Sequence, residues 1–137
     1  MQLKKHDRKK SRQYKKRSCG TFLCMLDNLL IFQKTYDFVV WLYFLINRLP
    51  KSHRPILGNK IHTLALDVLI AMIQANRLPL EKERSEIQAN ISVNIDTLRI
   101  LLRLTKDLKL MSIKQYTYAT KNLNEIARMH KSWSKCV

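Results

Sequence analysis

The chain has 137 residues and carries 26 Lys or Arg against 10 Asp or Glu, which gives a formal net charge of +16. This length is enough for one domain with a substantial core. Two glycines and three prolines are too few for the turns of a β-sandwich or barrel, so the composition favours long helices. The positive charge predicts a surface that attracts polyanions, either nucleic acid or anionic lipid.

The first 24 residues form a basic segment without apolar periodicity. Residues 1–20 contain nine Lys or Arg and a single acid, Asp7, so half of the net charge lies here. Such a composition predicts a disordered arm. Alternatively, translation starts at Met25, and residues 1–24 are an extension read from upstream sequence. The remainder, residues 25–137, is still basic, with 17 bases against 9 acids.

The cysteines give no sign of a metal site. Cys19, Cys24 and Cys136 form no C-x-x-C pair, and no histidines follow them at zinc-finger spacing. Residues 21–26 are too short an apolar segment for a signal peptide, and no small-residue cleavage site follows. We therefore expect reduced thiols, no metal, and a cytoplasmic protein.

A first helix is predicted from Asp27 or Asn28, either of which can cap it, to about Arg48. It contains the apolar block FVVWLYFLI at residues 38–46, which is too short to span a membrane. A helix that is apolar on nearly all sides is buried on more than one face. We expect a second subunit to cover the additional face, through Phe38, Trp41, Phe44 and Leu45.

A loop is predicted at residues 50–56, PKSHRPI, which contains two candidate binding residues, Lys51 and Arg54. A second helix follows at about residues 57–77 and ends at a break, Leu-Pro-Leu, at residues 78–80. Its apolar residues recur at the three-four spacing of a core stripe. The expected core residues are Ile61, Leu64, Ala65, Val68, Leu69, Met72 and Ile73.

A third helix is predicted at about residues 81–108, with its core stripe at Ile87, Ile91, Ile95, Leu98 and Leu102. Ser112 and Gln115 match a capping box that starts a fourth helix, which ends at about Lys131 or Ser132. The expected core face of that helix is Ile113, Tyr116, Ala119, Leu123, Ile126, Ala127 and Trp133. Together these segments predict an all-α, antiparallel up-down-up-down four-helix bundle over residues 25–133, followed by a short tail at residues 134–137.

The last two helices carry the candidate binding residues. Arg99, Arg103, Lys106 and Lys109 lie towards the end of the third helix, with Asp107 interrupting the run. On the fourth helix, bases recur at intervals of seven and form one ridge. They are Lys114, Lys121, Arg128 and Lys135. A solubilising face without a partner would show a similar composition, but the excess of bases favours phosphate binding.

Other chemistry has weaker support. Aromatic residues that could stack on nucleobases are Tyr14, Tyr116, Tyr118 and Trp133. Asp37 and Asp67 could form a carboxylate pair, although such acids more often pair with an arginine or a helix end. The histidines, His6, His53, His62 and His130, share no motif, and no phosphate-binding or nucleophile motif occurs. We therefore expect neither an enzyme nor a cofactor.

Five segments in order resemble the accessory variability determinant (Avd) family of diversity-generating retroelements. They are IFQKTYDFVVWL, LPKSHRPILGNKI, LALDVLI, LRILLRLTKDLKLMSIKQY and LNEIARMHKSW, and they fall within residues 29–133. In this resemblance, Arg99 and Arg103 fall on the paired arginines of the family motif L-R-x-x-L-R-x. Residues 1–24 depart from the family pattern, which begins near Asn28.

The resemblance implies a four-helix bundle that assembles into a basic homopentameric barrel. It also implies binding to the retroelement's reverse transcriptase and to its template-repeat RNA, with cDNA as a further candidate ligand. The transcriptase makes cDNA with mutations at adenines, which replaces a variable region in a target gene. This chain would organise the complex and carry out none of that chemistry.

Two alternatives remain open at this point. The four-helix proteins encoded within intervening sequences of ribosomal RNA genes are similar, and they would be structural proteins with a different partner. A peripheral membrane protein could use the basic arm, but residues 1–20 lack the apolar face that interfacial helices need. We therefore expect no membrane partner.

Overall fold

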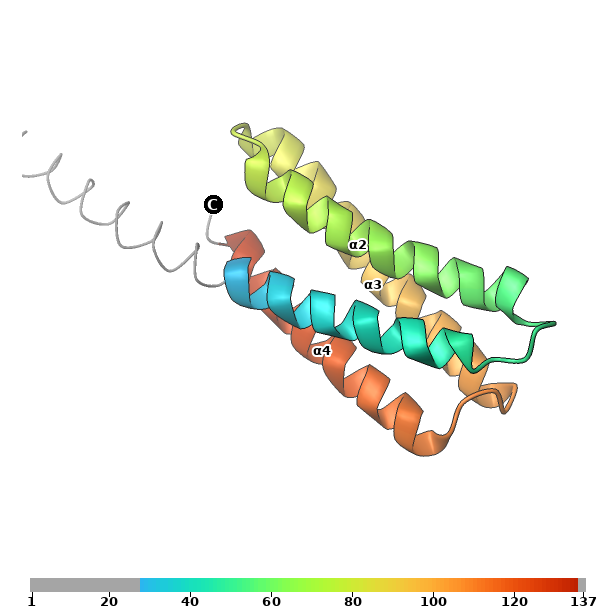
Figure 1. Cartoon of the computed structure of the whole chain (residues 1–137). Helices are drawn as coiled ribbons and strands as arrows, with labels where there is room; N and C mark the ends of the chain where they lie inside the picture. The colour runs from blue at the N-terminus through green and yellow to red at the C-terminus, as the bar shows by residue number, and fades with distance from the viewer. Residues whose placement is uncertain (1–27, 136–137) are drawn as a thin grey trace, which may run out of the picture.

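The computed structural model describes residues 28–135, which form four helices joined by short connections (Figure 1). The first helix covers Asn28–Asn47. A π-helical turn, η1 (Arg54–Gly58), leads directly into α2 (Asn59–Arg77), and α3 (Glu81–Asp107) and α4 (Ile113–Lys135) follow. Successive helices run in opposite directions in Figure 1. The predicted all-α, up-down-up-down bundle is therefore confirmed for the described residues.

Several sequence predictions lie outside the described residues. These are the arm at residues 1–24, the alternative start at Met25, Tyr14 and the cysteines Cys19, Cys24 and Cys136.

The second helical segment begins earlier than predicted. The residues from Arg54 to Ile56 were expected in a loop, but η1 makes them helical, and the backbone N–H of Gly58 donates to the carbonyl of His53 at 3.2 Å. Proline is tolerated at a helix start because its missing N–H would have no partner there, and Pro55 occupies such a position. A Cβ atom on Gly58 would lie 2.9 Å from Cγ2 of Ile46, so glycine permits the close approach of η1 to the first helix.

The capping box of α4 is confirmed. The backbone N–H of Ser112 donates to Oε1 of Gln115 at 2.9 Å, and the backbone N–H of Gln115 donates to Oγ of Ser112 at 3.1 Å. This reciprocal pair satisfies two donors that a helix start would otherwise leave without partners. α4 ends at Lys135, so Ser134 and Lys135 are helical although they were expected in a tail.

All four helices contribute to one core. Its fully buried side chains include members of the predicted stripes, together with Ile31 and Leu42 of the first helix. Two predicted core residues are wrong: Ile73 is 43% exposed and Ile113 is 76% exposed. Ile73 lies at the edge of the buried face of α2, and Ile113 is the first residue of α4, where the neighbouring turns cover little of it. The core residues include Ile61, Leu64, Met72, Ile91, Ile95, Leu98, Leu102, Leu123 and Ile126.

Two helices of the described chain, Asn28–Asn47 and Arg54–Arg77, are long and apolar enough to cross a membrane by length and composition alone. The apolar block at residues 38–46 is shorter than the helix that contains it. Core helices of soluble proteins also meet this criterion. Both helices supply buried residues to the core here, for example Leu42 and Val68.

His130 is a polar residue inside the contact between α3 and α4. It is only 4% exposed, its Nδ1 lies 3.4 Å from Oγ of Ser92, and its ring lies 5.9 Å from that of Trp133. Its Nε2 has no hydrogen-bond partner among the described residues. Burial lowers the pKa of His130 from its ordinary value, because a charged imidazolium would lose its hydration there.

We predict that His130 makes the bundle less stable in mild acid. The unfolded chain takes up a proton at His130 as the pH falls through its ordinary pKa near 6.5, while the folded chain resists protonation to lower pH. Stability is therefore full above that pH and decreases below it. Thermal unfolding of His130→Gln should change less between pH 7.5 and pH 5 than that of the parent. Equal pH dependence of the two proteins would contradict this prediction.

Candidate functional site

One predicted base of α3, Lys106, contacts the start of α4. Nζ of Lys106 is 4.6 Å from the centre of the Tyr116 ring, so this side of α3 adjoins the start of α4. Arg99 donates to Asp96 at 2.9 Å, and Lys106 and Arg103 lie 3.4 and 3.8 Å from the carboxylate of Asp107. Asp107, four residues after Arg103, was noted in the sequence, but the pairing of Arg99 with Asp96 was not predicted. The positive charge of α3 is thus partly neutralised by its own helix.

Lys109 occupies the turn that follows α3 and has a positive φ of 60°. The N–H of Leu110 donates to the carbonyl of Thr105 at 3.1 Å, and the N–H of Lys109 donates to that of Lys106 at 2.9 Å. These two bonds form a Schellman motif, in which the position of Lys109 is usually occupied by glycine. The exposed lysine therefore stands where a residue with a Cβ is disfavoured.

The predicted bases of α4 form an exposed ridge. Lys114, Lys121 and Arg128 are all exposed, and none takes part in the ion pairs found among residues 28–135. The opposite side of α4 is buried, at Ala119, Leu123 and Ile126 among others. Because the core fixes the rotation of α4, the interval of seven predicted from the sequence does give one solvent-facing row.

The one acid of α4 is engaged elsewhere. Oε2 of Glu125 lies 2.6 Å from Nζ of Lys34 on the first helix. The hydrogen bond and the charge of Lys34 lower the pKa of Glu125, and the positive fields of Lys121 and Arg128 lower it further. The one acid of α4 is therefore paired with the first helix, while Lys114, Lys121 and Arg128 take part in no ion pair among residues 28–135.

An open depression of about 500 Å³ lies along the outer face of α4. Two bases of the ridge, Lys121 and Arg128, border this depression. The depression also has neutral polar residues, which the spacing of the charged residues in the sequence did not predict. Only the rotation of α4 in the bundle shows that these residues share that face. The lining consists of Tyr116, Thr117, Thr120, Lys121, Asn124, Glu125 and Arg128. Lys131 is a further exposed base that the interval of seven omitted.

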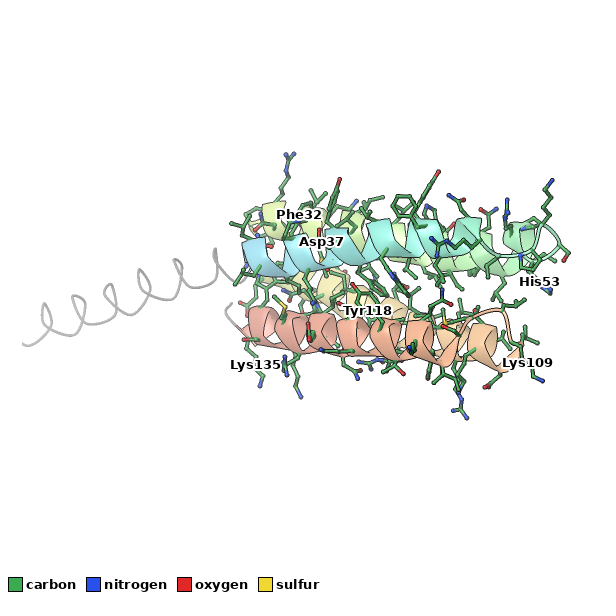
Figure 2. The ribbon with its side chains drawn as sticks, turned by 60° about the horizontal axis from the view of Figure 1, so that its bottom comes forward. Phe32, Asp37, His53, Lys109, Tyr118 and Lys135 are labelled. Atoms are coloured by element: carbon green, nitrogen blue, oxygen red, sulfur yellow. The ribbon has the colours of Figure 1, made fainter. Side chains whose placement is uncertain are left out.

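The bases of the first loop lie at one end of the bundle. Figure 2 shows His53 of this loop and Lys109 at the same end, and Lys135 at the other. The Nε–H of Arg54 donates to the carbonyl of Leu49 at 2.8 Å, so this side chain holds the turn into η1. Lys51 is exposed. We use the name basic surface for the candidate residues of α3, of α4 and of the turn between them, Arg99, Arg103, Lys106, Lys109, Lys114, Lys121 and Arg128.

The four residues expected at a subunit interface divide between two environments. Phe38 and Leu45 are 4% and 7% exposed and belong to the core of the single chain, so their expected place on an outer face is corrected. Trp41 is half-buried against that core, and only Phe44, 62% exposed, is fully on the surface. An apolar helix in this bundle fills its own core with one side and leaves the other side exposed.

One group of exposed apolar side chains lies on two adjacent helices. The first helix and α2 are in contact there, because the ring centres of Tyr43 and His62 are 5.0 Å apart. We name this set the apolar face: Tyr36, Val40, Tyr43, Phe44, Leu66, Ile70 and Ile73.

The remaining candidate residues from the sequence differ in their exposure. Trp133 is 4% exposed and belongs to the core, so a stacking role for it is wrong, whereas Tyr118 is 49% exposed. Asp37 and Asp67 are both exposed, and Asp37 accepts a hydrogen bond from Gln33, so they form no buried carboxylate pair. Among the described residues, no three His, Cys, Asp or Glu side chains group as metal ligands.

A family model described as bAvd-like matches residues 29–137, which include all four helices. The match therefore covers the whole bundle, including the basic surface. Searches of curated proteins and of solved structures found no match.

We predict that Lys109→Gly stabilises the bundle. Glycine adopts a positive φ without steric cost, so the free energy of unfolding should rise by about 0.5–1 kcal/mol. Lys109→Ala keeps the Cβ atom and should give no such gain. Urea unfolding followed by circular dichroism measures both variants. If Lys109→Gly proved no more stable than Lys109→Ala, this interpretation of the turn would be wrong.

Proposed function

The chain belongs to the bAvd-like family, the Avd proteins of diversity-generating retroelements, and from this premise we propose how it acts. As a member it is a non-catalytic accessory protein of such an element. We propose that its basic surface binds the template-repeat RNA and the reverse transcriptase, and that it holds the two together. cDNA made by the transcriptase would be a further ligand of the same surface.

The ridge of α4 is the observation that carries this proposal. Lys114, Lys121 and Arg128 are exposed and outside the described ion pairs, while the acid nearest to them is bound by Lys34. At 1.5 Å per residue, the ridge extends over about 21 Å. That length accommodates several phosphates of one strand. Contacts of this type neutralise phosphates without reading sequence, which suits a protein that organises a complex.

The division of charge between the two helices supports separate tasks. The bases of α3 are partly paired with Asp96 and Asp107, whereas those of α4 are not. A phosphate chain competes well for bases without an internal partner. We therefore assign the ridge of α4 to RNA, and the edge formed by Arg99, Arg103 and Lys106 to the transcriptase or to both ligands.

We also propose that the chain forms a homopentamer and that its apolar face lies between subunits. Apolar patches of this kind on a soluble domain commonly mark an interface. A closed ring with head-to-tail contacts requires a second, complementary surface on each subunit. The exposed row Val93, Ile100 and Leu104 on α3 provides an apolar surface for that purpose. Of the four residues expected at a subunit interface, Phe44 on the first helix lies on the apolar face and is the proposed contact.

The intervening-sequence type of four-helix protein shares the fold class, so the bundle alone does not separate it from this proposal. The bAvd-like match favours the retroelement. A reverse-transcriptase gene and a pair of repeats beside this gene would agree with the proposal, whereas a position inside a ribosomal RNA gene would oppose it. We further propose a cytoplasmic protein that uses no membrane, because both long apolar helices contribute to the core.

We predict that neutralising the ridge weakens RNA binding and its dependence on salt. The variant Lys114→Gln, Lys121→Gln, Arg128→Gln should lose affinity for the template-repeat RNA. The slope of log affinity against log salt concentration should become shallower by about 0.7–0.9 for each phosphate that the protein no longer neutralises. Fluorescence anisotropy at several salt concentrations measures both quantities.

A matched control tests whether position or net charge matters. Lys60→Gln, Arg77→Gln, Lys82→Gln removes three exposed charges from α2 and the start of α3, away from the ridge. This control should retain the parent's affinity more closely than the ridge variant. An equal decrease in affinity for the two variants would mean that the net charge alone attracts RNA, and the proposed surface would be rejected.

We predict that Phe44→Arg reduces the mass of the assembly without unfolding the chain. Phe44 is 62% exposed, so a charge at this position costs little in the single subunit but is costly between subunits. Light scattering after size exclusion measures the mass. Ile113→Arg, at an exposed position outside the apolar face, should leave the mass unchanged. A Phe44→Arg assembly of parental mass would contradict the assignment of this face.

A further inference from the structure

Tyr118 and Trp41 form an aromatic pair at the contact between α4 and the first helix. Their ring centres are 4.8 Å apart with an angle of 48° between the planes. Trp41 is half-buried against the core and contacts Phe38, whose ring centre is 5.9 Å away. Tyr118 is 49% exposed. The inner ring is thus fixed by the core, and the outer ring presents part of its surface to solvent.

The position of the pair follows from the antiparallel packing. Trp41 lies seven residues after Lys34 on the first helix, and Tyr118 lies seven residues before Glu125 on α4. Both cross-helix pairs are observed, with Lys34 and Glu125 2.6 Å apart. The first helix and α4 therefore meet along one seam at two points that lie two helical turns apart, and Figure 2 shows Tyr118 at this seam. The contact with Trp41 and the Lys34–Glu125 pair further along α4 keep Tyr118 at this seam.

Bases flank the exposed ring. Lys114 lies four residues before Tyr118 and Lys121 three residues after it, so both are its neighbours on one side of α4. Two acids are close to the seam, but Glu125 is paired with Lys34 and Asp37 accepts from Gln33. An exposed aromatic ring between two lysines can stack on a nucleobase, while the two lysines bind the phosphates on either side of that nucleotide.

We propose that Tyr118, supported by Trp41, stacks on an unpaired base of the bound RNA. This inference rests on the proposed function and specifies the ligand as single-stranded RNA at this point of the surface. In a duplex the base faces are covered by neighbouring base pairs, so an isolated tyrosine ring has no base face to contact. The site adds affinity without reading sequence, because every base has a π-face.

The other aromatic residues near the basic surface fit this role less well. The ring of Tyr116 is covered by the ammonium group of Lys106 at 4.6 Å, and Trp133 is buried. Phe44 is exposed but belongs to the apolar face. Tyr118 is the exposed ring that lies between two bases of the ridge.

The test compares Tyr118→Leu and Tyr118→Phe with the parent full-length chain, using a fluorescent oligouridine and an RNA duplex of equal length. Leucine keeps an apolar contact to Trp41 but removes the aromatic ring, whereas phenylalanine keeps the ring. Tyr118→Leu should bind the oligouridine about 5- to 100-fold more weakly, with duplex affinity and salt slope unchanged. Tyr118→Phe should bind as the parent does.

Trp41 offers an independent measurement. The chain has two tryptophans, and Trp133→Phe removes the buried one. In this background, oligouridine should quench the Trp41 fluorescence, and the duplex should not. Circular dichroism verifies that each variant is folded, and light scattering verifies its mass.

The possible outcomes separate the two proposals. If the parent binds RNA but Tyr118→Leu binds oligouridine equally well, the stacking site is rejected and the proposed function stands. A parallel decrease in affinity for oligouridine and duplex, or a change in assembly mass, also rejects stacking, because Tyr118 would then act on the surface as a whole. If the parent binds no RNA, both proposals fail.

Discussion

Burial of the isoleucine and leucine stripes of α3 and α4 determines where the bases of these two helices lie. Ile91, Ile95, Leu98 and Leu102 on α3 and Leu123 and Ile126 on α4 are at most 2% exposed. Full burial of such a side chain contributes about 1.5–3 kcal/mol, whereas an ion pair on a helix surface contributes a few tenths. The core therefore sets the rotation of both helices. The bases occupy the outer surface as a consequence of that rotation.

The charged residues of the two helices differ in their ion-pair partners. α3 carries acids within one turn of its bases, and these acids satisfy part of the positive charge. α4 has one acid, Glu125, and the first helix holds it through Lys34. The same seam places Trp41 against Tyr118, so one helix contact both pairs the acid of α4 with a lysine and supports an aromatic ring beside the ridge. Lys109 adds a further positive charge, although the positive φ of its backbone favours glycine.

Local patterns in the sequence were sufficient for the helices and for the row on α4. The capping box involves residues three apart, and the interval of seven depends only on helical geometry, so both follow without tertiary information. The sequence did not show which side chains of the apolar first helix face the core and which face solvent, because the direction of the core was unknown. Phe38 and Leu45 were therefore assigned to a surface that they do not reach. The pairs formed by Trp41 with Tyr118 and by Lys34 with Glu125 join distant parts of the chain and required the structure.

The central claim is that this non-catalytic bundle is an oligomeric scaffold that holds RNA by charge. Size exclusion with light scattering tests it most directly, on the full chain with and without the template-repeat RNA at low and high salt. The account predicts a protein mass of five times 16.3 kDa at both salts, with RNA bound at low salt and released at high salt. A protein that elutes as a monomer, and separately from the RNA at low salt, would contradict it.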